Sequence, residues 1–151
     1  MDRCAAAAIG CSLAGLPFLL PHVVEDFQLG IAQRAGLSTG MGAALLGAGF
    51  SVQILGLVLA GRGRRAGLAV TAVAGLVWAL GALLDHGPEM WAEGLDFRAG
   101  AVSSIWVLGL LASQALAASF ALAALLRHPL SPRARRQTDP GSLSPRRRGT
   151  G

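Results

Sequence analysis

Four long stretches without a charged side chain divide the chain. They cover Cys4 to Val24, Ala35 to Gly61, Ala66 to Leu84 and Ala99 to Leu126. About 20 apolar residues in a helix cross the roughly 30 Å hydrocarbon core of a bilayer, and each stretch is close to or above that length. The pattern predicts an all-α, polytopic membrane protein whose four transmembrane helices form one bundle. The predicted spans are about 4–24, 38–61, 66–84 and 101–126, within a membrane domain of residues 1–126.

Prolines modify two of the predicted helices. Pro17 and Pro21 lie in the first span. Since proline removes a backbone donor and bends a helix, a kink is expected near Leu16. In the third span, Gly87-Pro88 is expected to end the helix, and Pro88 is suited to the first turn of a new one. Residues 88–95 are therefore predicted to form a separate short segment at the membrane interface.

Composition agrees with a membrane location. The chain is 53% hydrophobic and only 14% charged, and its mean hydropathy is +0.55. These values are too apolar for an ordinary soluble domain. The prediction is a multi-pass protein integral to the plasma membrane.

The arginines predict the orientation. All 13 basic residues are arginines. Only two, Arg34 and Arg98, fall in the loops that follow the first and third spans; the others precede span 1, join spans 2 and 3, or follow span 4. Because cytoplasmic segments carry the excess of basic residues, both termini are expected in the cytoplasm. Most acidic residues lie on the opposite, outer side.

The sequence changes character at Arg127. Residues 127–151 are rich in Arg, Pro, Ser and Gly and contain little that could be buried. A disordered cytoplasmic tail is predicted, and its arginines are expected to be attracted to anionic lipid.

Two outer stretches resemble each other. PHVVEDFQLG and DHGPEMWAEGLDFRAG both contain His-x-x-Glu followed by Asp-Phe-x-x-Gly, although the spacing between the two parts differs. Each stretch follows an outward-going span and precedes an inward-going one. A tandem duplication of a helical hairpin would produce this pattern.

Few polar groups lie within the spans. No acid, base or histidine occupies the middle of any span, which argues against a proton-coupled or ion-pumping carrier. Gln53 and Gln114 are expected at similar depth, where they could bond across the bundle. Small residues repeat at four-residue spacing, as in the pair Ala43 and Gly47 and in the row that contains Thr71 and Gly75. Such rows serve close packing within the bundle or contact with a partner.

The first functional hypothesis requires no chemistry. We find no phosphate-binding loop, dinucleotide fingerprint, Cys-x-x-Cys pair or nucleophile elbow, so no catalytic residue is predicted. The basic pI reflects arginines beside the membrane and does not indicate nucleic acid. The expected function is that of an accessory or scaffold subunit, in contact with another membrane protein or with a second copy.

The alternative is a ligand site at the outer surface. Two imidazoles and several carboxylates suit a divalent metal such as zinc, which takes nitrogen and oxygen ligands. The candidate ligands are His22, Glu25, Asp26, His86 and Glu89. A less favoured version keeps only the histidines, as axial ligands of a haem.

Overall fold

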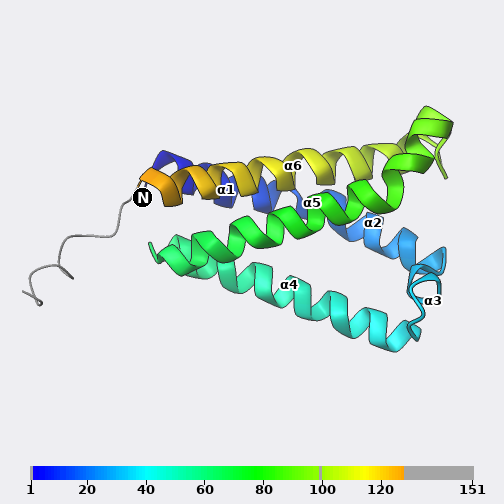
Figure 1. The fold of residues 1–151 in the computed structure, drawn as a ribbon, viewed down its shortest axis with the longest axis horizontal. Coiled ribbons are helices and arrows are strands. Elements are labelled where there is room, and N and C mark those ends of the chain that lie inside the picture. The colour runs from blue at the N-terminus through cyan, green and yellow to red at the C-terminus, as the bar shows by residue number, and fades with distance from the viewer. Residues whose placement is uncertain (1, 99, 128–151) are drawn as a thin grey trace, which may run out of the picture.

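The computed structural model describes residues 2–98 and 100–127, and these form helices without any strand. The long helices are α1 (Arg3–Ala14), α2 (Leu16–Gln28), α4 (Thr39–Gly61), α5 (Arg65–Glu93) and α6 (Ala101–Arg127). Two short helical segments, α3 (Ile31–Arg34) and the 3₁₀ helix η1 (Gly94–Asp96), lie in the connections at one end (Figure 1). The prediction of an all-helical chain is confirmed.

Four helical stretches are long and apolar enough to cross a membrane, as predicted. They are Arg3–Gln28, Thr39–Gly61, Arg65–Glu93 and Ala101–Arg127, and the first consists of α1 and α2 together. Of the predicted tail, Arg127 is the last residue of α6, and the remaining residues lie outside the described part of the chain.

The first stretch is interrupted at Gly15, beside the predicted kink at Leu16. Pro17 lies in the first turn of α2, where its missing N–H leaves no intrahelical bond unmade. Gly15 also has a packing role, because a Cβ there would overlap the side chains of Gln114 and Ser113 on α6. The break thus allows the chain to approach α6 closely while it changes direction.

The third stretch differs from the prediction. α5 continues through Gly87-Pro88 to Glu93, so residues 88–95 do not form a separate interfacial helix. Figure 1 shows α5 changing direction toward its C-terminal end. Proline in a helix interior costs one hydrogen bond but commonly kinks the helix rather than ending it. Trp91, in this last part, is 93% exposed.

Close packing centres on α5. It packs against α4 on one side and α6 on the other, while α1 and α2 run along α6. Gly67 faces the backbone of α4, and a Cβ at Gly75 would lie 2.7 Å from the carbonyl oxygen of Gln114. The row that contains Thr71 and Gly75 therefore packs inside the bundle, whereas a Cβ at Gly47 on α4 would meet nothing. Small residues at these positions allow the helix backbones to approach closely.

The two predicted mid-span amides meet at one residue. Gln53 Nε2 donates to Ser12 Oγ at 2.9 Å, and Gln114 Nε2 lies 3.4 Å from the Ser12 carbonyl oxygen. All three residues are buried. The expected bonding across the bundle is confirmed, with a serine of α1 between the two amides.

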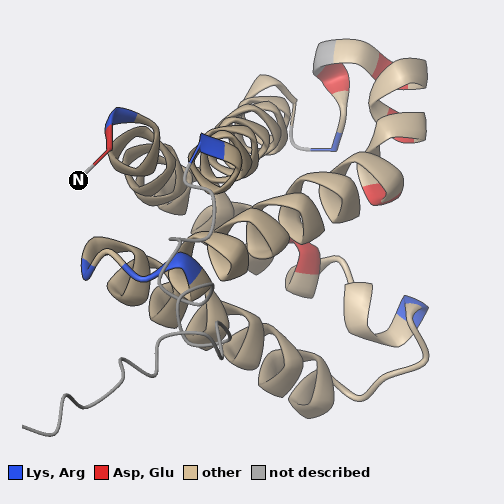
Figure 2. Cartoon of the chain, turned by 60° about the vertical axis from the view of Figure 1, so that its left-hand side comes forward, with Lys and Arg blue, Asp and Glu red and all other residues tan. Residues whose placement is uncertain are grey.

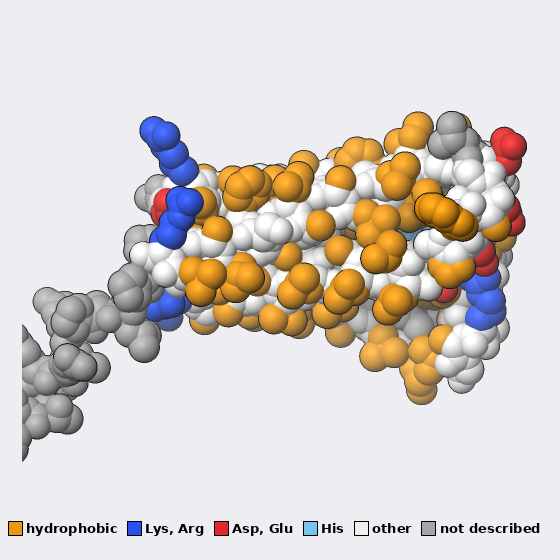
Figure 3. All heavy atoms as spheres, turned by 45° about the horizontal axis from the view of Figure 1, so that its top comes forward, with side chains coloured by type: hydrophobic (Ala, Val, Ile, Leu, Met, Phe, Trp, Pro, Cys, Tyr) orange, Lys and Arg blue, Asp and Glu red, His pale blue; other side chains and the backbone are white. Residues whose placement is uncertain are grey.

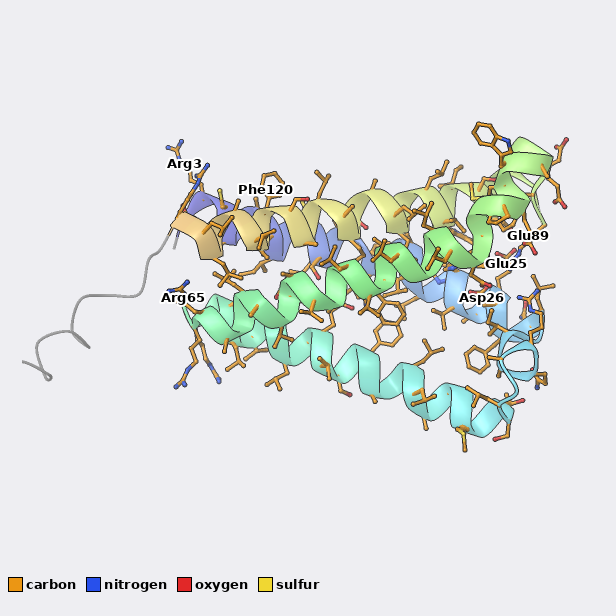
Figure 4. The ribbon with its side chains drawn as sticks, viewed as in Figure 1. Arg3, Glu25, Asp26, Arg65, Glu89 and Phe120 are labelled. Carbon is orange, nitrogen blue, oxygen red and sulfur yellow. The ribbon has the colours of Figure 1, made fainter. Side chains whose placement is uncertain are left out.

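The helices diverge away from this junction. α4 separates from α2 toward the end that carries α3 (Figure 1). Charged residues gather at the two ends of the bundle, as Figures 2 and 3 show, with hydrophobic side chains between them. We call the end with Glu25, Asp26, Asp85, Glu89, Glu93 and Asp96 the acidic end, and the end with Arg3, Arg62, Arg64, Arg65 and Arg127 the basic end. Figure 4 shows Arg3 and Arg65 at one end and Glu25, Asp26 and Glu89 at the other.

Candidate functional site

Two histidines from different helices meet at the acidic end. His22 comes from α2 and His86 from α5, and their ring centroids lie 4.7 Å apart in an edge-to-face arrangement. Only 3% of His22 and 1% of His86 is exposed. The predicted convergence of the two histidines is confirmed.

Asp26 joins the two rings. It follows His22 by one helical turn, so both side chains project from the same face of α2. Its Oδ2 lies 3.3 Å from His22 Nε2 and 3.5 Å from His86 Nε2. Asp85 Oδ2 lies 3.2 Å from the same nitrogen of His86. We call His22, Asp26 and His86 the His-Asp-His cluster.

Arg98 completes the arrangement from the connection before α6. Its Nη1 donates to Asp26 Oδ1 at 2.5 Å, and its Nη2 lies 3.1 Å from His86 Nδ1. Its guanidinium also lies 4.9 Å from the centroid of the Phe97 ring. The backbone of Arg98 has φ 52°, a left-handed conformation that is uncommon for a residue with a side chain. Contacts in the cluster therefore hold Arg98 in a conformation that its backbone alone disfavours.

Sequence reasoning did not select Arg98. It was counted only as one of two arginines on the outer side. Its position directly after the Asp-Phe of the second repeated stretch was a usable signal, because a lone cation among several acids is a natural ion-pair partner.

The guanidinium determines which nitrogen of His86 carries a proton. Arginine can only donate hydrogen bonds, so Nδ1 of His86 must accept from Arg98. In the neutral ring the proton then lies on Nε2, which faces the carboxylates of Asp26 and Asp85. His22 differs, since its Nδ1 is buried and has no hydrogen-bond partner among the described residues.

The two glutamates predicted as ligands lie apart from the cluster. Glu25 accepts a hydrogen bond from Ser103 Oγ of α6. Glu89 lies at the rim, with Oε2 at 3.7 Å from Nε of Arg98. The glutamates of the repeated His-x-x-Glu pairs are therefore not part of the cluster. His22 pairs with Asp26, four positions later. His86 lies near the carboxylates of Asp26 and of its own neighbour, Asp85.

The cluster has dimensions that suit a small cation. One potential ligand atom from each of its three residues lies within 4.8 Å of the others. Zinc bonds of about 2.0–2.1 Å at tetrahedral angles require ligand atoms roughly 3.3 Å apart. The distances of 3.3 and 3.5 Å from Asp26 to the two imidazole nitrogens are close to that value.

A cavity adjoins the cluster. Its volume is about 760 Å³, and residues of α2, α3, α4 and α5 line it. His22, Asp26, Asp85 and His86 contribute to its wall, which is otherwise largely apolar. The cluster thus forms part of the polar wall of the cavity, at its acidic end, and the rest of the wall is largely apolar.

Comparison of the chain with protein-family models, with curated proteins and with solved structures finds no match.

Proposed function

We propose that this protein is a small membrane protein that binds a divalent cation, with zinc as the best match, through the His-Asp-His cluster. The observation that carries the proposal is the convergence of three ligand atoms from α2 and α5 within 4.8 Å. Two imidazoles and one carboxylate are a common zinc-binding set. No catalytic step forms part of the proposal.

Arg98 is the group that would compete with a metal for Asp26 and His86. In the described arrangement its guanidinium neutralises Asp26 and bonds to His86 Nδ1. A metal on Nε2 of His86 would require the proton to move to Nδ1, where it would face another donor. Metal binding at this nitrogen therefore includes displacement of Arg98, and the dication replaces the guanidinium as the partner of Asp26.

A single small ion fits these histidines better than a haem. With ring centroids 4.7 Å apart and the rings edge to face, the described positions leave no space for a porphyrin plane between them. Axial ligation of haem would require α2 and α5 to move apart at the acidic end.

Metal analysis of the purified protein tests the proposal. After chelation and zinc titration in detergent, we expect one zinc ion per chain. The double variant His22→Ala, His86→Ala should abolish binding and retain membrane insertion. Glu25→Gln is the matched control, because Glu25 faces Ser103 outside the cluster. Zinc binding that survives the double histidine variant, or that is absent from the wild type, would reject this function.

We also propose a plasma-membrane protein with both termini in the cytoplasm. Its support is the separation of the acidic and basic ends, together with exposed hydrophobic side chains along the spans, such as Leu80 and Leu122. The arginines of residues 127–151 would then contact anionic lipid. A cysteine placed at Glu93 should react with an impermeant reagent from outside the cell. Protection of that cysteine in intact cells would contradict the orientation.

A tandem duplication is our proposal for the origin of the repeated stretches. Both histidines end in one cluster, which supports it. Superposing α2 and α4 on α5 and α6 should place His22 on His86. A superposition that fails to align these residues would argue for chance similarity.

An accessory or scaffold subunit is the second function we propose. It is favoured by α4, whose apolar window is 22% buried, the smallest share among the four stretches. A photo-crosslinker at Gly47 should then give a crosslink to another copy or to a membrane partner. Leu122, an exposed residue of α6, is the control position. Crosslinks to lipid alone at both positions would contradict this function.

A further inference from the structure

The cavity beside the cluster has the shape of a site for a chain-like ligand. Its volume of about 760 Å³ falls within the range of sites that hold small organic molecules. Along α5 its wall runs from Ala69 to His86, which is about 25 Å at 1.5 Å per residue. A compact ligand would leave much of this length empty, whereas an alkyl chain could follow it.

Most of the wall is apolar. On α5 the lining residues recur every three or four positions and include Val70, Val73, Val77 and Trp78. α4 contributes residues such as Leu45 and Val52 from the opposite side. This part of the wall offers mainly aliphatic and aromatic contact to a hydrocarbon chain.

The acidic end of the cavity is chemically different. Asp26 and Asp85 line it together with both histidines, and among the described residues no arginine does. Arg98 neutralises Asp26, whereas Asp85 has only the imidazole of His86 beside it, at 3.2 Å, and no arginine. The Asp85 side chain is 42% exposed, so a ligand can reach it. His22 is 3% exposed, and its Nδ1 has no partner among the described residues.

We propose that the cavity binds an amphiphilic amine, with the ammonium group on Asp85 and the alkyl chain between α2, α4 and α5. Charge complementarity selects this class. A fatty acid would bring a second carboxylate to the acidic end, and like charges repel. A fatty alcohol could make hydrogen bonds but would leave the charge of Asp85 without compensation. Asp85 lies beside the His-Asp-His cluster but is not one of its three residues, and the amine site is therefore tested in metal-free protein.

Binding of matched dodecyl probes tests the head group. The protein is placed in nanodiscs of zwitterionic lipid after treatment with a chelator, and empty nanodiscs measure simple partitioning. Dodecylamine is protonated at neutral pH, as lysine is. We expect it to bind saturably, at least about tenfold more tightly than dodecanol, since hydrogen bonds between charged groups are considerably stronger than neutral ones. Dodecanoic acid should bind most weakly.

Two variants test the location. Asp85→Asn should weaken dodecylamine binding about tenfold and leave dodecanol unchanged. Glu93→Gln removes an acid of the same end that does not line the cavity, and should have no effect. Gly81→Phe should reduce binding of all three probes, because Gly81 lines the cavity and a Cβ there meets nothing. Gly47→Phe is the matched control, since Gly47 is equally unobstructed but does not line the cavity.

The outcomes separate this site from the zinc site. Dodecylamine binding in metal-free protein supports the amine site whether or not zinc binds in a separate titration. Equal affinity for the three probes would mean that the cavity accepts only a chain, and would overturn the proposal. Lack of saturable amine binding, or equal effects of Asp85→Asn and Glu93→Gln, would overturn it as well.

Discussion

Substitution of Arg98 tests whether this arginine competes with a metal for the His-Asp-His cluster. It bonds to Asp26 at 2.5 Å and to His86 at 3.1 Å, and its side chain is only 9% exposed. In Arg98→Gln the Asp26 carboxylate loses its counter-ion while it remains largely buried. Removing one partner of a buried ion pair typically costs about 3–5 kcal/mol. We therefore expect the metal-free variant to be less stable than the wild type by about that amount.

Zinc should reverse the effect. In the wild type, zinc must displace two charge-assisted hydrogen bonds, each worth about 1.5–3 kcal/mol. The variant has no guanidinium to displace, so zinc should bind more tightly by about 3 kcal/mol. At 1.4 kcal/mol per tenfold, this corresponds to roughly a 100-fold lower Kd.

The assay is thermal unfolding in detergent, with and without zinc, combined with a zinc titration. The metal-free Arg98→Gln protein should melt at a temperature lower by about 10 °C, and saturating zinc should restore most of the loss. Arg34→Gln is the control, because Arg34 is the other arginine of the acidic end and lies on the exposed side of α3. If Arg98→Gln binds zinc no more tightly than the wild type, Arg98 does not compete with a metal, and the proposed displacement of the guanidinium is wrong.

Three further predictions concern the bundle. Gly75→Ala should lower the melting temperature by several degrees, because its Cβ would lie 2.7 Å from a carbonyl oxygen of α6. Gly81→Ala, where a Cβ meets nothing, should not lower it, and equal effects of the two variants would contradict the packing of α5 on α6. Ser12→Ala should cost about 1–3 kcal/mol in the unfolding free energy, because a buried amide of α4 loses its acceptor, whereas Ser51→Ala, at an exposed serine, should change it little. Truncation after Pro129 should leave the melting temperature unchanged, and a large loss would show that the tail packs on the bundle.

Much of the architecture follows from local properties of the sequence. Stretches of about 20 uncharged, apolar residues predict helices because a backbone in hydrocarbon must satisfy its own hydrogen bonds. The four stretches and the break beside Pro17 were predictable for this reason. The separation of basic and acidic ends was also predictable, because it depends only on which loop carries each charge.

The composition of the cluster depended on tertiary structure. The sequence offered Glu25 and Asp26 as neighbouring acids beside His22, but adjacent residues on a helix point about 100° apart, and the packing of α2 decides which one faces α5. Asp26 meets the histidines, while Glu25 turns to Ser103. Both acids are close to His22 in the sequence, so the sequence alone does not show which of them faces the histidines.

Arg98 and the end of α5 show the same limit. Whether Pro88 ends a helix or kinks it depends on the contacts available to the residues that follow, and here α5 continues to Glu93. The connection after α5 then returns Arg98 to a carboxylate 72 residues earlier in the chain, in a left-handed backbone conformation. Hydropathy and charge counts predicted the four spans and the acidic and basic ends of the bundle, because both are sums over neighbouring residues. The cluster required tertiary structure because its contacts depend on helix rotation and on the path of one connection, which no local sum contains.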